Sequence, residues 1–184
     1  MRLLIYAASA WGVFNAAYVT YLSFGPKGLE GLGHTTIAAA GIVSIGSWLM
    51  IISGALCGQI VDRFGRRNFV LTVCMGGAIV SLLLLSLPGA GLSASVLFGL
   101  IGMAPAGVIM AMSGQALRPQ VRAFGMGIFF TIYYAIMLIT PPITGVILDT
   151  RGSTEGALWL AIILFASVIP LAIAFQHVRN HNNR

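Results

Sequence analysis

The chain has 184 residues, of which 58% are hydrophobic and only 8% are charged. Soluble domains carry about 25% charged residues, so this composition excludes a water-soluble globular protein and predicts a protein embedded in a lipid bilayer. The formal charge of +6 does not indicate nucleic-acid binding, because the arginines form short clusters between long uncharged runs rather than a continuous basic stripe.

Six apolar stretches follow one another along the chain. A helix that crosses a hydrocarbon core of ~30 Å needs about 20 mainly apolar residues, and glycine and proline mark the expected turns, as at Gly25–Pro26 and Pro88–Gly89. No stretch shows the alternation of a barrel strand. We expect an all-α integral membrane bundle whose six transmembrane helices cover residues 3–25, 35–60, 68–87, 92–116, 122–147 and 156–176.

The basic residues gather on one side of this predicted topology. Eight arginines lie at the two termini and in the loops at 61–67 and 117–122, whereas the opposite loops hold only Lys27 and Arg151. Cytoplasmic loops of membrane proteins carry an excess of Lys and Arg. We therefore expect a multi-pass protein of the plasma (inner) membrane with both termini in the cytoplasm, and the surplus positive charge reflects that orientation.

Two segments share the skeleton G-x-x-x-D-x-x-G. "GQIVDRFG" occupies residues 58–65, and "GVILDTRG" occupies residues 145–152, three predicted helices later. The copies therefore face opposite sides of the membrane, and internal repeats of inverted topology are typical of secondary transporters. The chain is predicted to form one six-helix domain, 1–184, built from two inverted three-helix repeats at about 1–87 and 92–176. A chance match in a glycine-rich chain is the alternative.

The longer stretch "GQIVDRFGRRNFVL" resembles the loop between the second and third helices of a six-helix half in the major facilitator superfamily, where the pattern is G-x-x-x-D-R-x-G-R-R/K. "PPITGVILDTRG" is similar to the end of the penultimate helix, and "AWGVFNAAYVTYLSFGP" is similar to the first helix, of such a C-terminal half. The resemblance implies transport of a small solute by alternating access. Members normally have two halves, which implies a partner: a missing N-terminal half, a separate chain or a second copy in a homodimer.

The resemblance also implies that the arginine-rich loop forms a charge network with neighbouring helix ends and acts as a conformational switch. Its candidate residues are Gly58, Asp62, Arg63, Gly65, Arg66, Arg67 and Arg118. On physical grounds, Gly65 permits a tight reversal, and Gly58 with Gly54 lets helices approach closely. Asp62 can cap the next helix or pair with Arg66 or Arg118. A loop that merely fixes topology is the alternative.

Polar side chains inside the predicted spans are the candidate substrate ligands. No Asp, Glu, Lys, Arg or His lies in the middle of a span, so the chain offers no candidate proton carrier. Asn15 and Tyr18 share one helix face, and we expect both, with Tyr133, to face the interface where a second half docks. An interhelical hydrogen bond is the alternative role for Asn15. Gln115 is a further polar candidate, and Tyr21 is interpreted as an interfacial anchor.

The prolines inside predicted spans include Pro105 and the pair Pro141–Pro142. Each removes a backbone donor and should bend its helix. A freed carbonyl can line a cavity or bond to a neighbouring hydroxyl. Gating hinges and static kinks both remain open as interpretations.

The sequence does not predict an enzyme, a metal site or a cofactor. It shows neither a nucleophile–base pair nor a cluster of metal ligands, and the three histidines, His34, His177 and His181, lie in loops or in the tail. Cys57 and Cys74 are interpreted as small packing residues. The expected partners are the lipid bilayer, a small-molecule substrate and the second half, with no nucleic acid. The alternative function is a non-transporting membrane scaffold or a truncated remnant of such a transporter.

Overall fold

The computed structural model describes the backbone of residues 1–117 and 119–182. Within those ranges every regular element is a helix. Six helical spans are long and apolar enough to cross a membrane. The predicted all-α bundle of six transmembrane helices is therefore confirmed.

Five of the spans are continuous helices. They are α1 (Arg2–Gly31), α2 (Thr36–Phe64), α3 (Arg67–Leu85), α6 (Arg122–Arg151) and α7 (Glu155–Asn182). The fourth span is interrupted, and it consists of α4 (Gly91–Leu97), the π-helix η1 (Phe98–Gly102) and α5 (Ala106–Ala116). A short 3₁₀-helix, η2 (Pro119–Val121), leads into α6.

The first span extends beyond its predicted end. Gly25–Pro26 was expected to terminate this helix, but α1 continues to Gly31 with Pro26 in its interior. Proline removes one helical hydrogen bond, and tertiary packing compensates here. Gly25 and Leu29 are both buried against the rest of the bundle, and Leu29 has no exposed surface. Pro141, Pro142 and Pro170 likewise lie inside continuous helices, α6 and α7.

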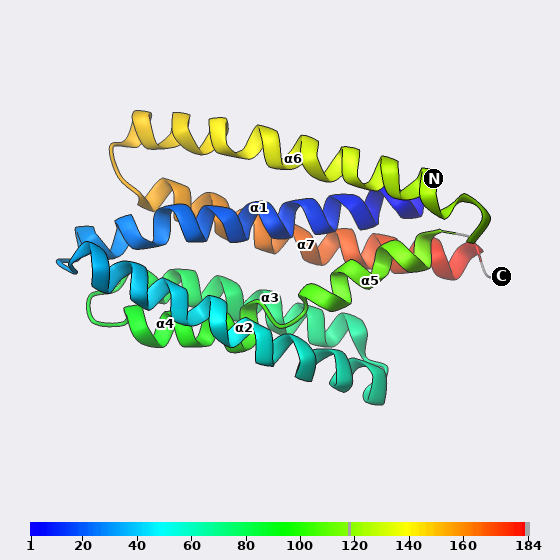
Figure 1. Cartoon of the computed structure of the whole chain (residues 1–184), viewed down its shortest axis with the longest axis horizontal. Coiled ribbons are helices and arrows are strands. Elements are labelled where there is room, and N and C mark those ends of the chain that lie inside the picture. The colour runs from blue at the N-terminus through cyan, green and yellow to red at the C-terminus, as the bar shows by residue number, and fades with distance from the viewer. Residues whose placement is uncertain (118, 183–184) are drawn as a thin grey trace.

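Helix α1 is the centre of the bundle. It packs most extensively against α7 and α6 and also contacts α2 and α5. Figure 1 shows α1 flanked by α6 on one side and α2 on the other, with α7 passing behind it. Its buried face carries Ala7, Ala10 and Ala17, and Ala161 and Ala172 are buried on α7. Small side chains let helix backbones approach closely, which explains why α1 can hold so many neighbours.

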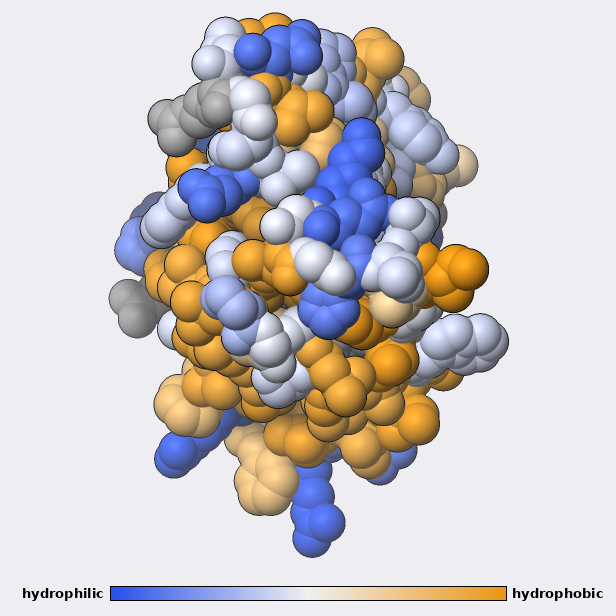
Figure 2. Space-filling view, turned by 90° about the vertical axis from the view of Figure 1, so that its left-hand side faces the viewer, coloured by the Kyte–Doolittle hydropathy of each residue, from blue (hydrophilic) through white to orange (hydrophobic). Residues whose placement is uncertain are grey.

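The surface of the bundle agrees with a membrane location. Figure 2 shows the end at which α1 ends and α2 begins, where hydrophilic side chains gather over the centre and upper part. Hydrophobic side chains cover most of the lower part in that view. Large apolar residues are exposed along the spans, including Trp48, Ile51 and Leu138. Such extensive apolar exposure requires lipid or another membrane helix to cover it.

The interruption of the fourth span is tightly packed against two neighbours. The Met103 amide bonds to the Phe98 carbonyl at 2.9 Å, and this wide turn precedes Pro105 and the start of α5. A Cβ built on Gly99 would lie 2.3 Å from the Gly46 carbonyl oxygen of α2. A Cβ on Gly102 would lie 2.9 Å from the Cα of Ala78 in α3. Glycine at these positions therefore permits backbone contact between spans.

We expect Gly99→Ala to destabilise the protein by about 2 kcal/mol or more, because its new methyl group would meet backbone atoms that cannot rotate away. Gly107→Ala is the matched control, since a Cβ there meets nothing within 4 Å. Thermal unfolding in detergent should show a lower unfolding temperature for Gly99→Ala only. Equal unfolding temperatures for the two variants would show that this backbone contact is not a tight constraint.

Candidate functional site

The two copies of the repeated skeleton end in the same helix cap. Gly65 follows α2 with φ 66° and ψ 0°, and its N–H bonds to the Val61 carbonyl at 2.9 Å. Gly152 follows α6 with φ 64° and ψ 9°, and its N–H bonds to the Leu148 carbonyl at 2.8 Å. This left-handed conformation favours glycine. The predicted tight reversal at Gly65 is confirmed, and the two caps lie at opposite ends of the bundle (Figure 1).

Asp62 does not cap the next helix, contrary to expectation. Helix α3 begins after Arg66 without any side-chain cap. The reason is that Asp62 still lies in the last turn of α2, before the reversal at Gly65. Asp62 and Arg66 are both exposed, and no hydrogen bond joins them in the described part of the chain. Arg118, the other expected partner, lies outside the described residues.

Gly58 does not bring two helices of this chain together. A Cβ added at Gly58 meets nothing within 4 Å, and one at Gly54 only approaches the Ala104 carbonyl at 4.0 Å. Gly145, the equivalent of Gly58 in the second copy, is equally open. The first glycine of each skeleton therefore faces space that the described residues of this chain leave unfilled.

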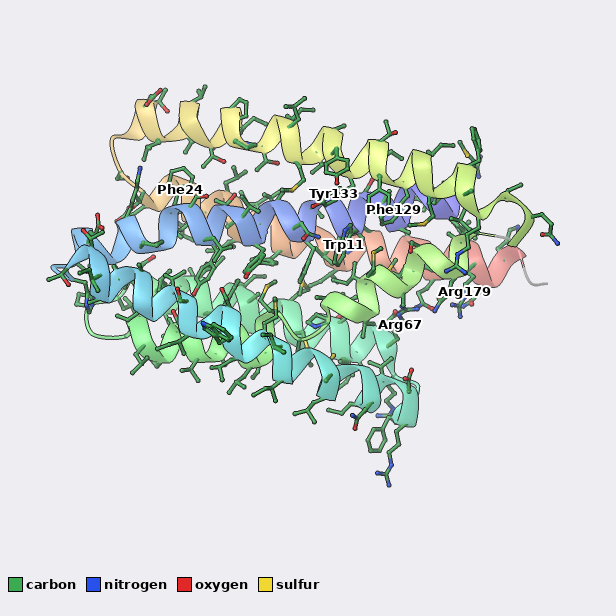
Figure 3. All side chains as sticks on the ribbon, in the orientation of Figure 1. Trp11, Phe24, Arg67, Phe129, Tyr133 and Arg179 are labelled. Atoms are coloured by element: carbon green, nitrogen blue, oxygen red, sulfur yellow. The ribbon has the colours of Figure 1, made fainter. Side chains whose placement is uncertain are left out.

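Arg67 is the residue of the loop that builds a network. Its Nη1 donates to Gln115 Oε1 at 2.7 Å, and its Nη2 donates to the Val108 carbonyl. Arg179 donates to the same Gln115 oxygen. The first residue of α3 is thereby tied to α5 and to the last turns of α7, and Figure 3 shows both arginines beside the end of α5. Arg67 Nε is buried without a hydrogen-bond partner among the described residues.

Gln115 joins the two arginines, because its side-chain oxygen accepts a hydrogen bond from each. It was a polar candidate from its type alone, but the sequence offered no signal that two arginines distant along the chain would share its oxygen. Two cations bonded to one neutral acceptor repel each other, so the contact depends on that oxygen remaining in place. We call this set of Arg67, Gln115, Val108 and Arg179 the arginine network.

Asn15 and Tyr18 lie together on a half-buried face of α1, as expected. The Asn15 amide nitrogen donates to the Trp11 carbonyl one turn earlier at 2.8 Å, so this hydrogen bond is within the helix and not between helices. Tyr18 donates to Ser47 of α2 at 3.0 Å. The neighbours Ala16 and Ala17 are fully buried. The two polar side chains are therefore held in place and remain partly accessible.

Tyr133 lies on α6 within an aromatic cluster. Its ring centroid is 6.2 Å from that of Phe130 and 4.8 Å from that of Tyr134. Figure 3 shows Tyr133 on the side of α6 that faces α1. The three candidate substrate residues thus come from two helices that pack against each other.

Tyr21 is not an interfacial anchor, contrary to the sequence interpretation. Its side chain is 1% exposed, and its hydroxyl lies 3.1 Å from Ser95 Oγ and 3.5 Å from the Val43 carbonyl. Its ring stacks on Phe98, the first residue of the π-helix, at a centroid distance of 4.0 Å. The helical spacing of Phe14, Ala17 and Tyr21, all on the buried face of α1, was the signal that could have revealed this position.

We expect Gln115→Leu to lower the free energy of unfolding by about 1–3 kcal/mol, because Arg67 would lose an acceptor while remaining half-buried. Gln115→Glu should instead raise stability, since a carboxylate bonds both cations more strongly. Gln59→Leu is the control, because Gln59 is exposed on α2. Thermal unfolding in detergent ranks the variants, and a Gln115→Leu protein as stable as Gln59→Leu would contradict the role of the network.

Comparison with known families adds an independent observation. The family model of the Major Facilitator Superfamily matches residues 3–184. No curated protein and no solved structure matches the chain. The match covers nearly the full length and agrees with the six membrane-spanning helices. The chain therefore belongs to the Major Facilitator Superfamily, a family of membrane transporters for small solutes.

Proposed function

We propose that this chain is one six-helix half of a secondary transporter that moves a small solute by alternating access, together with a second six-helix unit. One observation carries the proposal. The spans α2 and α6, which end in the repeated skeleton, are the least buried of the six. They flank α1, the helix that presents Asn15 and Tyr18 (Figure 1).

The uncovered surfaces of α2 and α6 support a helical partner. Trp48 is 72% exposed on α2, and Leu138 is 76% exposed on α6. Gly58 and Gly145 are open on the same two helices. Small residues let a second helix approach closely in a membrane, so these faces suit another protein unit as well as lipid. The solute would then bind between the units, against Asn15, Tyr18 and Tyr133.

The arginine network supports a switch at one end of the bundle. Arg67 and Arg179 connect α3, α5 and α7 through side-chain hydrogen bonds that can break and re-form. We infer that the loop residues Gly58, Asp62, Arg63, Gly65, Arg66 and Arg67, with Arg118, stabilise the state in which this end is closed. Opening would require Gln115 to release its two cations.

The repeat and the orientation belong to the same proposal. The two left-handed glycine caps share dihedral angles and hydrogen-bond pattern, which supports inverted repeats at about 1–87 and 92–176. The distribution of arginines supports cytoplasmic termini in the plasma (inner) membrane. A non-transporting scaffold is the competing function, and it needs neither accessible polar residues nor a breakable network.

The orientation predicts labelling from opposite sides. In a background with Cys57 and Cys74 replaced by alanine, Lys27→Cys should react with a membrane-impermeant maleimide added outside intact cells. Arg66→Cys should react only after the cells are opened. Both native positions are exposed in the structure. Reaction of both variants from the same side would exclude the six-span orientation proposed.

Alternating access predicts that a residue on the polar face of α1 can be reached from each side in turn. In the same background, Asn15→Cys should react with an impermeant maleimide in right-side-out and in inside-out vesicles. Ala17→Cys is the control, because Ala17 is fully buried two residues away. If Asn15→Cys reacts from one side only, or as slowly as Ala17→Cys, the scaffold function is favoured.

A further inference from the structure

A basic groove lies at one end of the bundle, between the start of α1 and the ends of α5 and α7. Its volume is about 530 Å³, which is within the range of about 300–1,000 Å³ that is common for ligand sites. Figure 1 shows these three helix ends at the same end of the molecule. The groove has polar side chains from Arg2, His177 and His181 and apolar walls from Leu3, Ala116 and Val178.

Acidic residues are scarce around this groove. Three of the four acidic residues of the chain belong to the opposite ends of α1, α6 and α7, and they are Glu30, Asp149 and Glu155. The fourth, Asp62, lies in the last turn of α2 and does not line the groove. The arginine network lies directly beside it, because Gln115 precedes Ala116 in α5. Basic side chains gathered without carboxylates attract an anionic ligand.

The polar side chains of the groove suit a phosphate group. Arg2, His177 and His181 are all exposed, so a ligand can reach them. The two histidines are four residues apart on α7 and share one helix face. A guanidinium donates two parallel hydrogen bonds to a phosphate, and an imidazole offers an N–H donor whether it is neutral or charged.

A second, apolar groove continues from the first. The two share Met1, Leu3 and Ala116, and the second has a volume of about 390 Å³. Its other lining residues are all without polar side-chain atoms: Leu4, Leu117, Val121, Phe124, Gly125 and Ile128. Phe124 and Ile128 are one turn apart, so this groove runs along the first turns of α6, away from the end of the bundle. Phe124 is 75% exposed there.

We propose that the two grooves together bind one anionic phospholipid, with its phosphate on Arg2, His177 and His181 and an acyl chain along Leu117, Phe124 and Ile128. A soluble anion would leave the apolar groove unfilled. A zwitterionic lipid would bring its own cation into a basic groove. Basic pockets between helix ends on the cytoplasmic side hold anionic headgroups in other membrane proteins.

The bound lipid would connect four helix ends beside the arginine network. Arg2 and Leu3 begin α1, Ala116 ends α5, and His177 lies in the last turns of α7, while the acyl chain follows the start of α6. Anionic lipid would therefore favour the closed state inferred for this end, and this consequence alone rests on the proposed function.

The test measures thermal unfolding of the purified chain in detergent during titration with phosphatidylglycerol, phosphatidylcholine or inorganic phosphate. A ligand that binds only the folded state raises the unfolding temperature, and we expect a saturable rise with phosphatidylglycerol alone. An equal rise with phosphatidylcholine would show that the headgroup charge is not recognised. An equal rise with inorganic phosphate would show a site for small anions. Either result, or no rise with phosphatidylglycerol, would overturn the proposal.

Arg2→Gln removes the permanent charge from the basic groove. It should raise the phosphatidylglycerol concentration at half-maximal shift about tenfold, the usual effect of losing one hydrogen bond to a charged group. Arg63→Gln is the matched control for lipid binding, because Arg63 is exposed in the last turn of α2 and lines neither groove. Equal half-maximal concentrations for the two variants would refute binding of the phosphate by the basic groove.

Phe124→Ser tests the apolar groove. Its side chain is exposed, so the fold should tolerate the change while the acyl chain loses an apolar wall. Phe69→Ser is the control, because Phe69 is 66% exposed on α3 and lines neither groove. Only Phe124→Ser should weaken the phosphatidylglycerol response. The same response in both variants would refute the path proposed for the acyl chain.

The result is separable from the test of alternating access, because unfolding requires no transport. A specific phosphatidylglycerol response in a chain whose Asn15→Cys variant reacts from one side only would uphold the lipid site and reject the proposed function. Labelling from both sides without that response would do the reverse.

Discussion

Backbone amides and carbonyls inside a bilayer have no water to bind, and each one left without a partner costs several kcal/mol. Several features of this bundle provide hydrogen-bond partners for polar groups inside the membrane. Asn15, Thr20, Thr140 and Thr144 all bond to carbonyls of their own helices. Where the fourth span departs from α-helical geometry, Ser53 of α2 donates to the Gly99 carbonyl at 2.6 Å. The irregular segment is thus satisfied by a neighbour rather than by solvent.

The same constraint explains the position of α1. Its neighbours must approach closely enough for side chains such as Tyr18 and Tyr21 to reach polar groups on α2 and α4. Alanines on its buried face permit that approach, and aromatic rings fill the remaining volume, with Phe14, Phe98 and Phe165 in edge contact. A central helix of small and aromatic residues therefore holds the bundle, and its polar side chains occupy fixed positions.

The sequence was sufficient for the features that depend on local chemistry. The lengths of the apolar stretches predicted the number and order of the spans. The last glycine of the first G-x-x-x-D-x-x-G copy predicted the reversal at Gly65. Features that depend on distant residues could not be predicted. The π-helix at Phe98–Gly102 packs closely against Gly46 and Ala78, and the pairing of Arg67 with Gln115 joins residues far apart along the chain. Pro26 failed as a stop signal because the burial of Leu29 outweighs one missing hydrogen bond.

The glycine caps at Gly65 and Gly152 end their helices through backbone geometry alone, with nearly identical dihedral angles. Both cap hydrogen bonds join backbone atoms, the Gly65 and Gly152 N–H groups and the Val61 and Leu148 carbonyls. Helix termination is therefore independent of the local charge, which is strongly basic after α2 and sparse after α6. Mutation can redistribute the arginines between the two turns, and with them the side of the membrane that each turn prefers, while both helices still end at the same residue. In this fold, insertion orientation can evolve separately from architecture.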